Sequence, residues 1–171
     1  LKSITLPNTL EYIGASVFSD CTALTEIKLP NNSLRSLGNS AFGGCTGIKH
    51  FHIPETVWSM HNSFSGCKGI ESITVDWMST YYRAEDGILY NLDKSEILFV
   101  YSLDGTTLTI PKTARNIQSS ALDTCTELER FECEEGSTYY TAADGVLYAN
   151  TSQGKMLAMA PKKLAGKFVV P

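Results

Sequence analysis

The chain has 171 residues, of which 43% are hydrophobic and 19% charged, and its formal net charge at pH 7 is −4. This acidic balance argues against a nucleic-acid-binding surface, which would require a basic excess or stripe. Purely apolar runs extend over only a few residues, so we expect no membrane-spanning segment in this chain. The length is typical of a single domain with a substantial hydrophobic core.

A short sequence phrase recurs along the chain, and its clearest copy is Leu24–Pro30. The phrase consists of an apolar residue, two polar residues, an apolar–polar–apolar run and a proline. Pro7, Pro30 and Pro54 close the first three copies, so the period is 23 to 24 residues. Before each proline the alternation of apolar and polar residues predicts a short strand, and proline then ends its pairing because it has no amide hydrogen.

Each copy continues with two more apolar residues, a small residue and the sequence Phe-x-x-Cys. We expect this second half to contain a single helical or 3₁₀ turn. The aromatic residue is replaced by Leu122 in the last short copy, which otherwise keeps the pattern. The recurring pairs are Phe18 and Cys21, Phe42 and Cys45, Phe64 and Cys67, and Leu122 and Cys125.

Two longer units replace the direct path from strand to proline. Residues 81–90 and 139–148 share an aromatic pair, an Asp-Gly dipeptide and a following apolar run, and the two copies are 58 residues apart. Asp-Gly is a turn signal. Each dipeptide precedes a strand, a polar turn (residues 91–95 and 150–154) and a second strand, which predicts two inserted β-hairpins.

A single unit of this length cannot bury its own apolar residues, whereas stacked units bury them in continuous columns. The period lies within the range of about 20 to 29 residues that is typical of leucine-rich repeats. The sequence therefore predicts a leucine-rich-repeat solenoid that is mainly β, with short stacked parallel strands, single-turn helices and two inserted β-hairpins.

Leu29-Pro30, residues 41–46 and residues 86–91 resemble the BspA-type leucine-rich repeats of bacterial and some protozoan surface proteins. The resemblance covers nearly the whole chain. It implies an exported or surface-anchored bacterial protein that binds other macromolecules, located at the outer surface of the cell. It brings no catalytic activity and no cofactor. The departures from the family pattern are Met60, Ala114, Leu122 and Tyr101, the last standing where the second hairpin has Pro161.

We expect one solenoid domain over residues 1–171. It comprises three short repeats and a following strand (1–75), a hairpin-containing insertion (76–111), a short repeat (112–133) and a second hairpin-containing insertion (134–171). Leu1 falls inside a copy of the phrase and Pro171 closes one. A solenoid without caps exposes its core at the ends. We therefore expect a segment of a longer array, or ends that self-associate end to end or edge to edge.

The five cysteines occupy columns where the repeat requires a small or apolar core residue, which is a common role of free cysteine. A metal site would favour close pairs such as Cys-x-x-Cys, and the sequence has none. Stacked cysteines also point in one direction, which does not suit the dihedral angle of a disulfide. We therefore interpret all five as structural: Cys21, Cys45, Cys67, Cys125 and Cys133.

His50 and His52 lie two residues apart in one predicted strand and share its solvent face. A zinc site there would need further ligands, because structural zinc takes four. The acidic run 127–135 similarly lacks the loop pattern of dedicated calcium sites. We predict solvated faces in both places and no metal site.

The outward residues of stacked strands in a solenoid form its usual binding surface. We expect one continuous surface here, polar and mixed in charge, that contacts host or neighbouring-cell proteins or glycans. Trp58, Trp77, Tyr81 and Tyr139 lie outside the clearest core columns, either as contact residues or as covers of the hairpins. The candidate binding residues are Glu26, Lys28, Lys49, His50, His52, Glu71, Ser72, Thr74, Glu129, Arg130 and Glu132.

Two alternatives to a binding module remain open. One is a structural spacer that projects another domain from the cell surface. The other is a polysaccharide-acting solenoid enzyme, which would require charged residues clustered in stacked positions. The nearest such cluster, Glu129, Arg130 and Glu132, is small, and no nucleophile motif is present, so we expect no catalytic residues.

Overall fold

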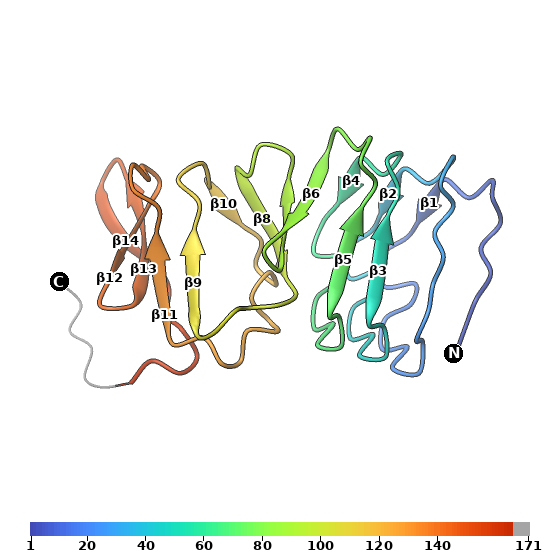
Figure 1. Ribbon diagram of the computed structural model, residues 1–171, viewed down its shortest axis with the longest axis horizontal. Helices are drawn as coiled ribbons and strands as arrows, with labels where there is room; N and C mark the ends of the chain where they lie inside the picture. The colour runs from blue at the N-terminus through green and yellow to red at the C-terminus, as the bar shows by residue number, and fades with distance from the viewer. Residues whose placement is uncertain (166–171) are drawn as a thin grey trace.

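The computed structural model describes residues 1–165. The chain winds into an elongated stack of coils that begins at the N-terminus and ends in the second hairpin (Figure 1). These residues contain fourteen strands, most of them short. No helix long and apolar enough to cross a membrane occurs among them.

The first side of the stack carries the strand phrase. Its strands pair in parallel, as expected from repeated coils, but in two separate sheets. The first two copies of the phrase contribute only a bridge between Thr5 and Lys28. The sheets are β3 (His50–Ile53) with β5 (Ser72–Val75), and β9 (Thr107–Ile110) with β11 (Arg130–Cys133).

The second side carries shorter parallel strands, seen behind the first side in Figure 1. Here β1 (Tyr12–Ile13), β2 (Ser36–Leu37) and β4 (Ser59–Met60) pair in that order. Further along, β10 (Asn116–Ile117) pairs in parallel with the last strand of the first hairpin.

Both predicted hairpins are present, and each has one strand more than the sequence predicted. The antiparallel units are β6 (Tyr82–Glu85), β7 (Ile88–Asn91) and β8 (Glu96–Val100), and β12 (Tyr140–Ala143), β13 (Val146–Thr151) and β14 (Gly154–Met159). The additional strands β6 and β12 precede the Asp-Gly turns. Asp86 and Gly87, like Asp144 and Gly145, have positive φ, which is the backbone of a two-residue hairpin turn.

The expected single-turn helices are absent from residues 1–165, and this part of the prediction was wrong. The Phe-x-x-Cys stretches form consecutive turns on a third side of the stack, where Cys45 N–H bonds the carbonyl of Phe42. Phe42 N–H instead donates to Ser63 of the next coil, at 3.0 Å. These bonds between coils compete with helical ones, and a positive φ of 52° at Ser40 interrupts the helical path.

Polar contacts on the third side join the two halves of the stack across the first hairpin. Asn62 N–H donates to Gln118 Oε1 at 2.8 Å, and Ser120 donates its hydroxyl to Asn62 Oδ1 at 2.7 Å. Ser65 likewise donates to Asp123, at 3.0 Å. Gln118 is buried, so its partner is needed to offset the cost of desolvating the amide.

In the second and third copies of the repeat the columns predicted as core are buried, including Leu24, Ile27 and Leu29 of the clearest phrase. In the first copy Leu1 is exposed and Leu6 is only partly buried. The Phe column forms a ladder in which Phe42 stacks between Phe18 and Phe64, with ring centroids 5.3 and 6.2 Å away. Phe64 in turn lies 5.6 Å from Phe99 of β8, so the first hairpin continues the column.

Candidate interaction surface

The strand phrase separates a buried face from an exposed one with a period of two. In β3 the side chains of Phe51 and Ile53 are buried, whereas those of His50 and His52 are exposed. β5 pairs with β3 in the register that keeps this alternation, since His50 lies opposite Ser72 and His52 opposite Thr74. The alternation therefore places the expected polar residues of neighbouring coils side by side.

Hydrogen bonds between coils hold both imidazoles in place. His50 Nδ1 lies 2.9 Å from Ser72 Oγ, and His52 Nδ1 lies 3.0 Å from Thr74 Oγ1. Each ring thus has one nitrogen engaged by the next strand and the other, Nε2, outside that contact.

A salt bridge extends this ordered polar row. Lys49 Nζ lies 2.8 Å from Glu71 Oε1, and both side chains are more than half exposed. The hydrogen bond and the charge of Lys49 lower the pKa of Glu71 below its usual range. Exposed pairs of this kind contribute little to stability, so the bridge orders the surface more than it holds the fold.

An open hollow of about 500 Å³ lies over these strands. It brings together five of the predicted residues: Glu26, Lys28, His50, His52 and Thr74. Asn31 also lines it, although the sequence reasoning did not single it out. The contribution of Asn31 depends on how the chain turns after Pro30, which no strand periodicity reveals.

Three of the predicted residues lie away from this surface. Glu129, Arg130 and Glu132 belong to the coil of β11, in the second parallel sheet. Figure 1 shows β6 and β8 between β5 and β9. The expectation of one continuous strand surface was therefore wrong, because the first hairpin interrupts the parallel pairing.

The predicted surface is thus divided into two patches. We call the residues Glu26, Lys28, Lys49, His50, His52, Glu71, Ser72 and Thr74 the N-terminal patch, and Glu129, Arg130 and Glu132 the C-terminal patch. In the C-terminal patch Arg130 Nε lies 3.4 Å from Glu132 Oε1, and Thr106 donates to Glu129 Oε2 at 3.1 Å. Its hollow, of about 560 Å³, includes Asp144 and Gly145 of the second hairpin turn.

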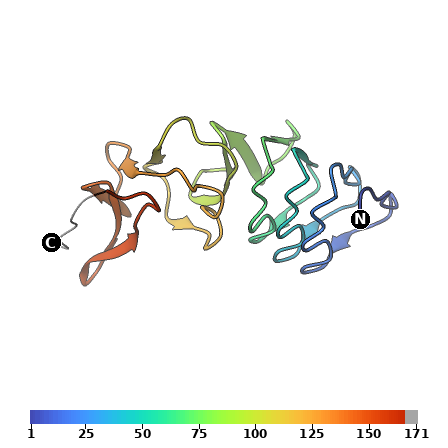
Figure 2. The same cartoon turned by 90° about the horizontal axis from the view of Figure 1, so that it is seen from below.

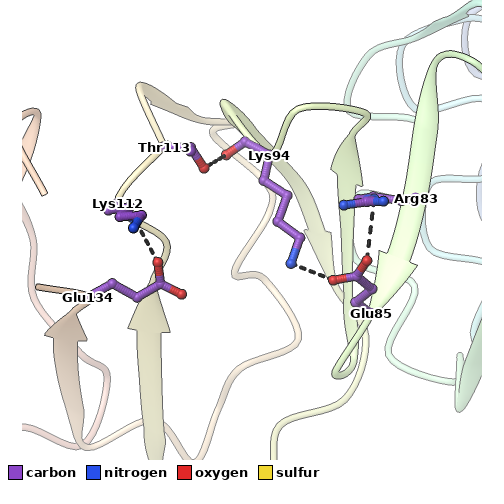
Figure 3. Close-up of polar contacts among 6 residues, drawn as sticks. All are labelled: Arg83, Glu85, Lys94, Lys112, Thr113 and Glu134. Carbon is purple, nitrogen blue, oxygen red and sulfur yellow. Dashed lines mark hydrogen bonds and ion pairs between the residues drawn. The ribbon is translucent and has the colours of Figure 1, made fainter. Parts of the chain in front are cut away.

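A polar network links the first hairpin to the coil that follows it, as Figure 3 shows. Glu85 accepts from Lys94 and pairs with Arg83 Nε at 3.3 Å, and the hydrogen bond from Lys94 lowers the pKa of Glu85. Thr113 donates its hydroxyl to the backbone carbonyl of Lys94 at 3.0 Å. The network also includes a bond from Lys112 N–H to Glu134 Oε2 at 3.0 Å. These charges have partners within the fold, which indicates a structural role.

All five cysteines are free, and they lie in the predicted repeat columns. Cys45 and Cys67 are buried and donate their thiols to the carbonyls of Phe18 and Phe42 of the preceding coils, at 3.0 and 2.9 Å. Burial raises the pKa of Cys45 to about 11 and that of Cys67 to about 12. Thiols this hard to ionise are poor nucleophiles and poor metal ligands at neutral pH.

Among the described residues, His50 and His52 have no third metal-ligating partner. Within residues 1–165, no three His, Cys, Asp or Glu side chains gather closely enough to hold a metal ion.

The aromatic residues outside the core columns differ in their surroundings. Arg115 places its guanidinium 5.1 Å from the ring centroid of Tyr139, a cation–π contact that partly covers this ring. Trp58 and Tyr81 are about half exposed. Trp77 is 89% exposed, so its indole covers very little of the hairpin.

Comparison with known proteins agrees with this architecture. Among solved structures, the pneumococcal vaccine antigen PcpA matches with a TM-score of 0.70 and 25% identity, over 80% of this chain and 34% of PcpA. A leucine-rich repeat protein from Eubacterium ventriosum shares the fold with a TM-score of 0.61 and 23% identity, over 77% of this chain and 33% of its own. The chain therefore spans about a third of the length of these structures. No protein of curated function matches it.

The sequence also matches a protein-family model. The model is described as "BspA type Leucine rich repeat region" and fits in six copies, over residues 1–99 and 88–143. These ranges cover most of the chain and include both parallel sheets of the first side of the stack. The chain belongs to the BspA-type leucine-rich repeat family.

Proposed function

We propose that this chain is a non-catalytic, macromolecule-binding module of an exported bacterial surface protein, and that the N-terminal patch makes the contact. The observation that carries the proposal is the ordered row of polar side chains around the hollow of about 500 Å³. Stacked strands present such residues at regular intervals, which suits an extended partner.

The chemistry of the N-terminal patch favours a polar, hydrated contact. Lys28 and Glu26 bring both signs of charge to the hollow, and His50 and His52 add aromatic rings that can donate or accept hydrogen bonds. Interfaces with protein surfaces or glycans commonly combine direct and water-mediated hydrogen bonds of this kind. Enclosed sites for small molecules are in contrast mostly apolar.

The family and the structural neighbours support a location at the cell surface. BspA-type repeats resemble those of surface proteins, and one neighbour in structure, PcpA, is a vaccine antigen. Adhesion to host or neighbouring-cell proteins or glycans is the role that we propose for this module.

The proposal is tested by surface plasmon resonance against immobilised extracellular-matrix proteins and glycans, together with a cell-adhesion assay. We expect the chain to bind at least one of these ligands. Replacing Lys28 and His52 by alanine should weaken that binding by about tenfold, because contact residues at the centre of an interface contribute most of its affinity. The matched control is Arg35→Ala, which removes an exposed charge beside the second side of the stack.

Absence of binding to every ligand, or equal binding by the Lys28/His52 variant, would contradict the proposal. The first result would favour the structural spacer, which the elongated stack in Figure 2 also suits. New reducing ends after incubation with polysaccharides would instead indicate the enzyme alternative.

A further inference from the structure

The first hairpin unit presents an unusual group of exposed apolar side chains. Trp77 is 89% exposed, in the turn between β5 and β6. Leu92, in the turn between β7 and β8, is 43% exposed, and Met78 and Tyr81 are also exposed. Isolated exposed apolar residues are ordinary, but an almost fully exposed indole beside others requires an explanation.

The second hairpin unit provides an internal control for these residues, because several of its backbone hydrogen bonds repeat those of the first unit. Leu92 N–H donates to the carbonyl of Tyr81 at 2.8 Å, and its counterpart Asn150 donates to Tyr139 at 2.8 Å. The turns that contain Trp77 and its counterpart close similarly, with backbone bonds from Ser79 to Asp76 and from Ser137 to Glu134 at 2.9 and 3.2 Å. The two units therefore share these backbone bonds, with two local differences. Gly136 has a φ of +85° whereas Met78 has no positive φ, and Asn150 lies within β13 whereas Leu92 lies in a turn.

At the positions of Trp77, Met78 and Leu92 the second unit has no large apolar side chain. Glu135 stands at the position of Trp77, Gly136 at that of Met78 and Asn150 at that of Leu92. The hairpin fold thus forms without an indole or an aliphatic side chain there. Trp77 and Leu92 are not required by the architecture, which leaves them available for a ligand.

Trp77 and Leu92 border an open hollow of about 380 Å³. The lining also includes the polar residues Thr74, Asp76 and Arg83. The volume lies within the range of about 300 to 1,000 Å³ for small-ligand sites. Figure 2 shows this region, at the transition from β5 to the first hairpin, in the middle part of the stack.

We propose that this hollow binds a sugar residue of a glycan chain. A pyranose ring has an apolar C–H face and a rim of hydroxyl groups. The face of the Trp77 indole carries negative quadrupole charge and attracts C–H groups, while Leu92 adds apolar contact. The Asp76 carboxylate accepts hydrogen bonds. The Arg83 guanidinium pairs with Glu85 through Nε and has further N–H donors on its terminal nitrogens, so the two residues together can engage neighbouring hydroxyls.

Two further observations favour a glycan over an apolar protein segment. Met78, the residue next to Trp77, does not line the hollow. The lining mixes polar and apolar groups, and besides Trp77 and Leu92 the apolar ones are Ile73, Val75, Tyr82 and Ala84. Thr74 lines both this hollow and that of the N-terminal patch. A glycan chain can therefore continue from one hollow to the other, in which case the inference names the ligand class of the proposed binding module.

The chain offers a direct spectroscopic test, because it contains only two tryptophans. In the Trp58→Phe variant, Trp77 is the sole indole. We expect an array of host and bacterial oligosaccharides to reveal binding by the wild-type chain. Titration of the Trp58→Phe variant with the strongest-binding oligosaccharide should then give a saturable change in tryptophan emission.

The decisive variant transfers the second unit's residues to the first, as Trp77→Glu with Leu92→Asn. It should lose oligosaccharide affinity by about tenfold or more while unfolding at the same temperature as the wild type. The matched control, Trp58→Ala, removes a half-exposed indole from the second side and should bind as the wild type does.

Absence of any oligosaccharide bound on the array, or undiminished affinity in the Trp77/Leu92 variant, would overturn the inference. Neither result bears on protein binding through the N-terminal patch, which the Lys28/His52 variant tests separately. Loss of protein binding in the Lys28/His52 variant, with oligosaccharide binding retained, would support both sites as independent contacts.

Discussion

At the scale of single residues, the Asp-Gly turns explain why glycine is needed at one position of each hairpin. Gly87 has a φ of +77°, a conformation that side chains disfavour. A Cβ atom on Gly87 would also lie 2.0 Å from the carbonyl oxygen of Ser102, which is far inside van der Waals contact. Gly105 has a similar φ of +82° but open space around the position of its missing Cβ.

We predict that Gly87→Ala destabilises the fold more than Gly105→Ala does. Both substitutions incur the strain of positive φ, about 1–2 kcal/mol. Only Gly87→Ala must also move the Ser102 backbone. The free energy of unfolding, measured by urea denaturation, separates the two variants. Equal losses would show that the hairpin shifts without cost and that the close approach to Ser102 is not a constraint.

The buried thiols predict a loss of stability in alkaline solution. Burial raises the pKa of Cys45 from about 9 to about 11, so the folded chain holds this proton more tightly than the unfolded chain does. This contribution to stability is complete below about pH 9 and is lost as the pH rises toward 11. Cys67 behaves in the same way over a range that extends to about pH 12.

We therefore expect the urea midpoint of the wild type to fall above pH 9. The double variant Cys45→Ser and Cys67→Ser keeps a donor for the carbonyls of Phe18 and Phe42 but has no titrating group at these two positions. Its midpoint should fall less steeply over the same pH interval. If the urea midpoints of the wild type and the double variant fall equally with rising pH, the loss of stability belongs to other groups. Tyr82 is one such group, because burial raises its pKa to about 12.

At the scale of elements, the first hairpin separates two hydrophobic cores and contributes side chains to both. Leu89 and Phe99 belong to the N-terminal core, which extends back to Ile13. Ile88 and Ile97 belong to the C-terminal core, which includes β9 and β11. Successive residues of a strand point to opposite faces, so one hairpin can complete both cores.

This division predicts that two neighbouring substitutions destabilise different halves of the molecule. Leu89 and Ile97 are each at most 1% exposed, and their replacement by alanine should cost about 2–5 kcal/mol. In hydrogen exchange, Leu89→Ala should mainly speed the exchange of backbone amides in β3 and β5. Ile97→Ala should mainly speed the exchange of those in β9 and β11. The same acceleration in all four strands would show that the stack opens as one cooperative unit.

The repeat pattern predicted most of the fold because each core column recurs in phase. The apolar positions around Leu24 and Ile27, the parallel pairing and both hairpins follow from it. The turns at Phe42 were predicted wrongly, because hydrogen bonds between coils override the local helical pattern. Strand β6 was missed, although Asp86-Gly87 with positive φ at both residues is typical of a two-residue hairpin.

The candidate site was less predictable than the fold. Strand alternation places His50 and His52 together, since it depends only on local periodicity. The separation of Arg130 from them depends on how the first hairpin is inserted, which is a property of the three-dimensional stack. The hollow at Trp77 likewise combines residues from two turns and two strands. The pattern of any one of these segments does not reveal that they lie close together.

At the scale of the whole molecule, the two hairpins differ in what covers their last strand. Tyr90 pairs with Ile97 in the first hairpin and Tyr148 with Leu157 in the second, with a bulge at the same place, so Ile97 and Leu157 are equivalent. Ile97 is fully buried because β10 pairs with β8. Leu157 is 48% exposed, and among residues 1–165 no strand pairs with β14 on its other side.

An uncovered strand edge with exposed apolar side chains is a site of association. At the opposite end of the stack, β1 also has a free edge among the described residues, and Tyr12 is exposed there.

We therefore predict that this 171-residue chain self-associates end to end, with β1 of one copy beside β14 of another. This arrangement can extend because it does not close on itself. In sedimentation velocity the weight-average mass should rise with concentration, and Leu157→Lys should shift this rise to concentrations about tenfold higher or more, because the added lysine opposes edge pairing. The control Met78→Lys introduces the same charge at an exposed apolar residue away from both edges and should leave the wild-type behaviour unchanged. A wild-type chain that sediments as a monomer throughout, or an unaltered Leu157→Lys variant, would show that β14 is not an association edge.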